Sequence, residues 1–193
     1  GLKTAASKMP RVDAIGGSSA GIIVDNRPMV ASLFRGVPKE RYHAIRCLFL
    51  RLRDEMKVPL EVINDGEVTA LAGAMSLEDN AILGVALGSS EAGGYVNRQG
   101  GINPWLNELA FMPVDYQPNA PVDEWSGDRG TGVLYFSQQC VFRLASKAGI
   151  SLPSEVTDAE KLKSAQDRLE TGHEGAADIW RTIGCYLGYA VAH

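Results

Sequence analysis

Apolar residues repeat along the first part of the chain with two different periods, which predict alternating strands and helices. Three short apolar runs are typical of strands: 12–15, 22–24 and 60–63. After Pro38, apolar side chains recur at helical spacing as far as Met56, which predicts one long amphipathic helix. An alanine-rich segment at 67–75 predicts a shorter helix. This order of strand, helix, strand and helix is typical of an α/β layer with parallel strands.

The second part of the chain predicts a β-hairpin, a loop and a group of helices. The segments 82–87 and 95–97 read as two strands joined by a glycine- and serine-rich turn. The segment 101–127 is rich in proline, asparagine and tryptophan and lacks periodicity, so we expect an ordered loop. Helical patterns then return at three places: 132–148, 157–169, where TDAE is a capping box, and a last helix lined by Ile179, Trp180, Ile183 and Leu187.

Length and charge narrow the class of protein. The 193 residues are enough to bury a core as one domain or as two small lobes. The 19 basic and 23 acidic residues give a net charge of −4, and no basic stripe is present, which argues against nucleic acid as a partner. The longest apolar stretch is far shorter than the roughly 20 residues of a membrane span. We therefore expect a soluble, cytoplasmic protein with no membrane or nucleic-acid contact.

Cysteine and histidine offer little for metal binding. Cys47, Cys140 and Cys185 are widely separated and form no CxxC pair, so each is expected to be a small buried apolar group. The sequence contains only three histidines, and none has a neighbour at metal-ligand spacing. We expect no metal site built from the protein's own side chains.

The stretch INDGEVTALAG, at 63–73, places a carboxylate between a strand and a helix. Open α/β sheets bind ligands at the carboxyl ends of their strands, and there Asp65 could take a proton from a substrate hydroxyl as a general base. Alternatively, Asn64 or Asp65 could simply cap the helix that follows. The local pattern leaves both readings open.

Four further stretches could bind ligands. In GSSEAGG, at 88–94, backbone amides and serine hydroxyls could hold phosphate oxygens, although a plain hairpin turn uses the same residues. In NPWLNELA, Asn103 and Glu108 could hydrogen-bond sugar hydroxyls beside Trp105, or could be ordinary exposed residues. The glycine-rich segments 16–21 and 127–132 are either functional loops or tight turns.

The order of these stretches resembles the ROK family of sugar kinases and repressors, within the actin and hexokinase superfamily. The similarity extends from VDAIGGSSAGIIVD to the final IGCYLGYAVA. It implies an α/β fold of ribonuclease H-like, actin-like ATPase lobes. Residues 1–78 would be the C-terminal part of an N-terminal, sugar-side lobe. Residues 79–193 would be most of a C-terminal, nucleotide-side lobe.

The resemblance also implies roles for individual residues. Asp65 matches the catalytic base, and three residues match sugar-binding positions: Asn64, Asn103 and Glu108. Residues matching phosphate- or nucleotide-binding positions are Gly88, Ser89 and Ser90, in the family's second phosphate loop with Gly93 and Gly94 behind it, and Gly130 and Gly132. The implied activity is the ATP-dependent phosphorylation of a hexose or amino sugar, with Mg²⁺, by a homodimer.

The sequence also departs from the family pattern. Phe111 stands where the family has a histidine, and the cysteines that complete a zinc site are missing. The first phosphate loop, Asp-x-Gly-Gly-Thr, has no counterpart, so we expect a piece of a longer protein with little or no kinase activity by itself. The alternatives are a sugar-sensing domain of a ROK-type repressor and a structural lobe used for dimerisation.

Overall fold

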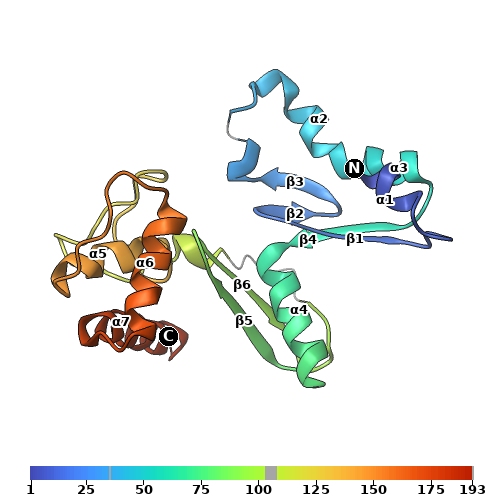
Figure 1. Ribbon diagram of the computed structural model, residues 1–193. Helices are drawn as coiled ribbons and strands as arrows, with labels where there is room; N and C mark the ends of the chain where they lie inside the picture. The colour runs from blue at the N-terminus through green and yellow to red at the C-terminus, as the bar shows by residue number, and fades with distance from the viewer. Residues whose placement is uncertain (35, 103–107, 193) are drawn as a thin grey trace. The chain divides into compact units, whose positions relative to one another are not determined.

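The computed structural model describes residues 1–34, 36–102 and 108–192, and the chain packs as two compact units (Figure 1). Unit 1 contains Gly1–Val85 and Gly93–Asn107, and unit 2 contains Ala86–Ala92 and Glu108–His193. In the described part of the chain, no helix is long and apolar enough to cross a membrane. The lobe boundary expected at residue 78 stays a prediction.

Unit 1 is built around a parallel pair of strands. β1 (Ile15–Ser19) pairs in parallel with β4 (Leu60–Asn64), so that Ser19 lies opposite Asn64. This pairing confirms the predicted α/β layer. The strand expected at 12–15 lies instead at 15–19, in the glycine- and serine-rich segment, because the backbone of that segment is hydrogen-bonded to β4.

A small hairpin lies beside this pair in unit 1. β2 (Ile22–Val24) pairs antiparallel with β3 (Arg27–Val30). The turn residues Asp25 and Asn26 have φ values of 49° and 59°, as the tight turn of a two-residue hairpin requires. The Asn26 side chain accepts a 2.6 Å hydrogen bond from the Val62 N–H, which ties the hairpin to β4.

The prediction of a single long helix between Pro38 and Met56 is wrong. The structure has a 3₁₀ turn η2 (Lys39–Arg41), then α2 (Tyr42–Arg46) and α3 (Leu48–Met56). The break is at Cys47, whose ψ of 3° departs from helical geometry. The Cys47 thiol lies 3.7 Å from both the Arg27 guanidinium and His43 Nε2, so it is half-buried among polar groups rather than in an apolar core.

The other elements of unit 1 are two helices, a 3₁₀ turn and part of a second hairpin. They are α1 (Leu2–Ala6), η1 (Ser32–Phe34), α4 (Asp65–Leu77), β5 (Ile82–Leu87) and β6 (Glu91–Val96). β5 pairs with β6 as predicted. The returning strand begins at Glu91 rather than Tyr95, so that Gly93 and Gly94 lie in the strand and only 88–90 form the turn.

Glycines let α4 lie directly against the β5–β6 hairpin. A Cβ added at Gly66 would lie 2.3 Å from the Gly93 carbonyl oxygen, and one at Gly94 would lie 2.4 Å from the Gly66 carbonyl oxygen. A Cβ added at Gly84, in β5, would lie 2.5 Å from the Cα atom of Ala70, which is further along α4. These contacts leave no room for side chains, so they hold the start of α4 on the backbone of β6.

Gly66→Ala is expected to lower the free energy of unfolding by about 3 kcal/mol, because the added methyl meets backbone atoms that cannot turn aside. Gly73→Ala, in the same helix, is the matched control, since its Cβ would meet Ile82 at an ordinary 3.7 Å. That control should be neutral or stabilising by about 0.5–1 kcal/mol through helix propensity. Urea unfolding of both variants measures the difference, and equal stabilities would refute the packing assigned to Gly66.

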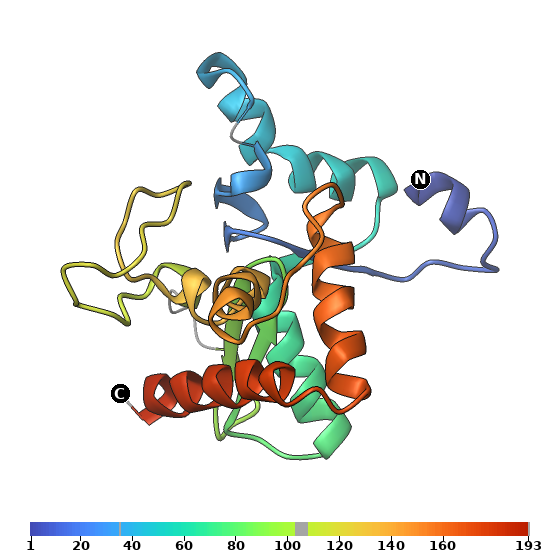
Figure 2. The ribbon, with the colours of Figure 1, turned by 60° about the vertical axis from the view of Figure 1, so that its left-hand side comes forward.

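Unit 2 is mainly helical. Its elements are η3 (Leu109–Phe111), η4 (Gly132–Leu134), α5 (Gln138–Lys147), α6 (Asp158–Glu170) and α7 (Glu174–Ala192), drawn from yellow-green to red in Figure 2. The predicted capping box at Thr157 is confirmed. The helix expected at 132–148 is divided, because the Ser137 side chain accepts the Gln139 N–H and starts α5 there.

The core of unit 2 joins the three helices. Cys140 and Leu144 of α5 pack with Ile179 and Ile183 of α7 and with Ala165 of α6. A second cluster gathers the residues of η4 around Phe136, which is 1% exposed. The predicted apolar face of the last helix is therefore confirmed, and Cys140 is buried as expected. Burial was wrongly predicted for Cys185, which is exposed.

Candidate functional site

Asp65 lies where the sequence placed it, at the junction of β4 and α4 in unit 1. Asn64 is the N-cap: its side-chain oxygen accepts the Gly66 N–H at 2.8 Å. The Glu67 carboxylate accepts the Asn64 N–H at 3.3 Å and completes a capping box. Burial raises the pKa of Glu67, and its hydrogen bond from Asn64 opposes this rise.

Helix capping and chemistry are thus assigned to different side chains. The Asp65 carboxylate is partly exposed and receives a longer, 3.2 Å contact from the Gly66 N–H. It lies in the first turn of α4, where the helix dipole stabilises negative charge. The capping interpretation is confirmed for Asn64, while the role of Asp65 as a base stays a prediction.

Two glycines of β6 lie beside this helix start. The contacts of Gly66 with Gly93 and Gly94 bring the backbone of β6 against the first turn of α4. The side chain of Asn64 is also fixed, because its Nδ2 atom donates a hydrogen bond to the Gly21 carbonyl oxygen at 2.8 Å. The structure therefore holds the Asn64–Asp65 backbone between two neighbouring segments of unit 1.

The turn 88–90 belongs to unit 2 and is attached to the start of α5. The Gly88 N–H donates to the Ser90 carbonyl, and the Gly88 carbonyl accepts the Gln138 N–H, both at 2.9 Å. Ser89 and Ser90 are exposed. The amides of Gly88 and Gln138 are thus both engaged, and the phosphate role predicted for this loop stays a prediction.

Gly130 and Gly132 lie in the same unit, but their amides are already engaged. The Gly130 N–H donates to the Pro121 carbonyl at 2.8 Å, and the Gly132 N–H donates to the Met112 carbonyl at 2.9 Å. Gly130 has a φ of 68°, and a Cβ there would lie 1.9 Å from the Asp115 carbonyl oxygen. These glycines therefore shape the loop itself, and their nucleotide role stays a prediction.

Glu91 is a residue of this region that the sequence patterns did not single out. It directly follows Ser90, and only 4% of its surface is exposed. Its Oε2 atom has no hydrogen-bond partner among the described residues, and burial raises the pKa of its carboxyl group to about 7. The available signal was a lone charged residue in the otherwise small and polar segment GSSEAGG.

The predicted sugar contacts of the 103–108 loop are only partly described. Asn103 lies outside the described residues. Glu108 immediately precedes η3, and its carbonyl accepts the Phe111 N–H at 3.1 Å. The Phe111 ring packs against Trp125 in a tilted arrangement with centroids 5.0 Å apart, so the residue at the predicted histidine position makes an apolar contact.

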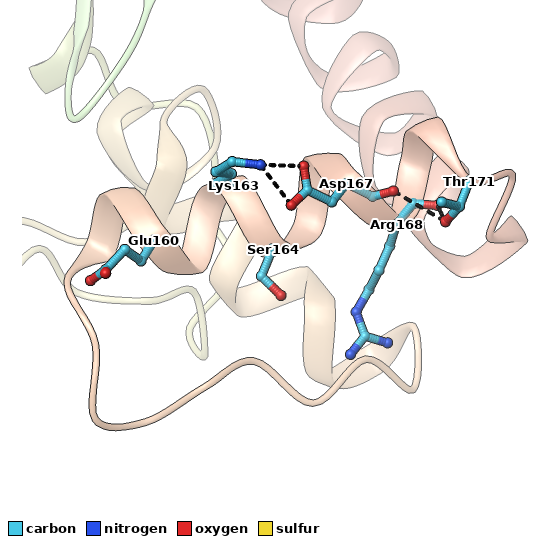
Figure 3. Close-up of a pocket in the computed structure, with 6 residues that line it drawn as sticks. All are labelled: Glu160, Lys163, Ser164, Asp167, Arg168 and Thr171. Atoms are coloured by element: carbon cyan, nitrogen blue, oxygen red, sulfur yellow. Dashed lines mark hydrogen bonds and ion pairs between the residues drawn. The ribbon is translucent and has the colours of Figure 1, made fainter.

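A shallow hollow of about 480 Å³ follows one face of α6, and its lining includes none of the described predicted site residues (Figure 3). The lining residues are Glu160, Lys163, Ser164, Asp167, Arg168 and Thr171. The Lys163 ammonium group bonds both Asp167 oxygens, at 2.7 and 2.8 Å, which neutralises the centre of this face. Among the described residues, no three side chains of the metal-binding types lie together as a metal site.

No protein-family model matches the sequence, and no curated protein matches it. Solved structures do share its fold. A ROK-family glucokinase from Streptomyces griseus, in complex with glucose and AMPPNP, has a TM-score of 0.74 and 17% identity, over 98% of this chain and 63% of that protein. A ROK hexokinase from Thermus thermophilus has a TM-score of 0.67 and 18% identity, over 99% and 62%.

A ROK-family transcriptional regulator, described as a homologue of the E. coli MLC protein, is also similar. It has a TM-score of 0.68 and 19% identity, over 99% of this chain and 48% of the regulator. The chain thus spans from about half to less than two thirds of the length of these structures. The predicted actin-like α/β fold and its likeness to ROK structures are confirmed. Kinases and a regulator share this fold, so fold alone does not assign the activity.

Proposed function

We propose that this chain is part of an ATP-dependent sugar kinase that phosphorylates a hexose or an amino sugar. Asp65, the proposed base, and Asn64, the proposed sugar contact, belong to unit 1, and the proposed phosphate loop 88–90 belongs to unit 2. The observation that carries the proposal is the division of roles at the start of α4. Asn64 and Glu67 cap the helix, which leaves the Asp65 carboxylate at a strand end for chemistry.

In the proposed reaction, Asp65 accepts the proton of a sugar hydroxyl as that oxygen attacks the γ-phosphorus of MgATP in line. The bond between the γ-phosphorus and the bridging oxygen breaks, and its electron pair leaves with ADP. The Asn64 amide nitrogen carries a second N–H besides the one it gives to the Gly21 carbonyl, and we assign that N–H to a sugar hydroxyl. Positioning of the hydroxyl provides much of the rate.

Mg²⁺ enters this reaction as part of the MgATP substrate, where it neutralises charge on the β- and γ-phosphates. The chain's own contribution to the phosphates is the turn 88–90 at the N-terminus of α5, through the helix dipole and the two serine hydroxyls. The similar S. griseus glucokinase was crystallised with glucose and AMPPNP, which supports a sugar and a nucleotide as the ligands of this fold.

The second candidate is a sugar-sensing domain of a transcriptional regulator. The similar ROK-family regulator supports it, and so do the engaged amides of Gly130 and Gly132, because a sensor can lose phosphate contacts and keep a sugar pocket. In the encoding gene, an upstream Asp-x-Gly-Gly-Thr segment would favour the kinase. An upstream helix-turn-helix would favour the regulator.

Calorimetric titration of the full-length gene product distinguishes these candidates. The titrants are a panel of hexoses and amino sugars and, separately, AMPPNP. A kinase is expected to bind one or more sugars and the nucleotide, whereas a regulator binds sugar alone. Binding of neither ligand would overturn both candidates and would leave a structural role.

A further inference from the structure

The buried Glu91 carboxyl group lies beside Gly132 in unit 2. A Cβ added at Gly132 would lie 2.7 Å from Glu91 Oε2 and 2.3 Å from the Leu109 carbonyl oxygen. Glycine at 132 is therefore what leaves room for the carboxyl group. Thr131, the preceding residue, is 2% exposed, and its hydroxyl also has no hydrogen-bond partner among the described residues.

Burial raises the pKa of the Glu91 carboxyl group, with no contribution from a charged partner among the described residues. Glu91 Oε2 and the Leu109 carbonyl oxygen both border the space beside Gly132, and a protonated carboxyl group can donate to an oxygen acceptor whereas an ionised one cannot. η4, which begins at Gly132, and η3, which begins at Leu109, contain no ionisable side chain. The ionisable residues that adjoin these elements in the sequence are Glu108, directly before η3, and Tyr135, directly after η4. No positive charge on these elements therefore faces Glu91.

The backbone connects this buried group to the turn 88–90. Glu91 follows Ser90 directly, and the other end of the turn is held by the bond from the Gln138 N–H to the Gly88 carbonyl. The turn is thus anchored at Gly88 by α5 and at Glu91 by the space beside Gly132. Loss of either anchor frees one end of the turn.

We propose that Glu91 is a positioning residue that couples the turn 88–90 to Gly132, so that the turn keeps its phosphate-binding shape only while the Glu91 carboxyl group stays seated. This inference rests on the proposed phosphate role of that turn. The buried form is the neutral one, because the carboxyl group is 4% exposed and its Oε2 atom accepts no hydrogen bond from the described residues. Ionisation, which occurs as the pH rises through about 7, expels the carboxylate and loosens the turn.

Hydrogen exchange of the 193-residue chain tests the coupling without any ligand. The amide of Gln138, the donor to Gly88, is expected to lose about tenfold in protection factor between pH 6 and pH 8. Glu91→Gln keeps a neutral side chain and should hold the same protection at both pH values. Glu124→Gln replaces an exposed glutamate of the same unit and should respond as the unmodified chain does. A pH-independent Gln138 amide in the unmodified chain, or an equal loss in Glu91→Gln, would overturn the coupling.

AMPPNP affinity of the full-length gene product at pH 6.5 and pH 8 tests the consequence for phosphate. Between pH 6.5 and pH 8, the AMPPNP affinity of the unmodified protein is expected to fall about tenfold further than that of Glu91→Gln. Titration of the nucleotide itself affects both proteins equally and cancels in this comparison. If neither protein binds AMPPNP while the exchange results hold, the coupling stands and the proposed kinase function fails. If both bind it with identical pH dependence, Glu91 does not position the turn.

Discussion

Asp65→Asn is expected to lower the sugar-phosphorylating rate of the full-length gene product by about 10²–10⁴-fold, the usual contribution of a positioned general base. Asparagine keeps the size of the side chain but cannot accept the hydroxyl proton. The helix cap should survive, because Asn64 and Glu67 form it and Asp65 adds only the longer contact to Gly66. The substitution therefore separates chemistry from folding at this position.

The measurement is the initial rate of ADP release at saturating sugar, with sugar affinity determined in parallel. Asp54→Asn is the control, because Asp54 is an exposed carboxylate of α3 that pairs with Arg53 at 3.1 Å. It should leave both the rate and the affinity unchanged. An Asp65→Asn enzyme that retains the full rate would remove Asp65 from the mechanism, and one that loses sugar binding and folding together would point to a structural role.

Glu91→Gln is expected to stabilise the chain at pH 8 by about 3 kcal/mol and to change its stability little at pH 5. The folded-state pKa of about 7 lies above the ordinary 4.5, so the folded state holds a proton that the unfolded chain has released. The contribution of Glu91 to stability is therefore greatest below pH 4.5 and is lost as the pH rises to about 7. At about 1.4 kcal/mol for each pKa unit, the loss reaches about 3 kcal/mol.

Urea unfolding of the unmodified chain and the variant at several pH values between 5 and 8 measures this difference. Other titrating groups affect both proteins alike and cancel in the comparison. The gap in free energy of unfolding should open between pH 5 and pH 7 and then stay constant. A gap that is the same at every pH would show that Glu91 is not buried in its neutral form.

The sequence predicted the local setting of Asp65 well. A strand ending in Asn-Asp-Gly before an alanine-rich helix is a strong short-range pattern, and the structure has β4 and α4 there. The parallel partner of β4 was harder to place. Its residues at 16–19 resemble a bend in isolation and become a strand only because β4 lies alongside.

Features set by distant contacts escaped the sequence patterns. The helical period runs through Cys47 without interruption, but the structure breaks the helix where Arg27 and His43 approach the thiol. The place of Glu91 likewise depends on Gly132, some forty residues later, which has no side chain to fill that space. Neither local propensity nor periodicity contains such information.

Phosphoryl transfer is the direct test of the proposal that this chain carries the base and a phosphate loop of a sugar kinase. The full-length gene product is incubated with MgATP and each member of a panel of hexoses and amino sugars, and ³¹P NMR follows the phosphate. The account predicts sugar-dependent loss of the γ-phosphate signal with formation of a sugar phosphate, and little or no turnover by the 193 residues alone. Sugar binding without any ATP turnover, across the whole panel, would contradict it.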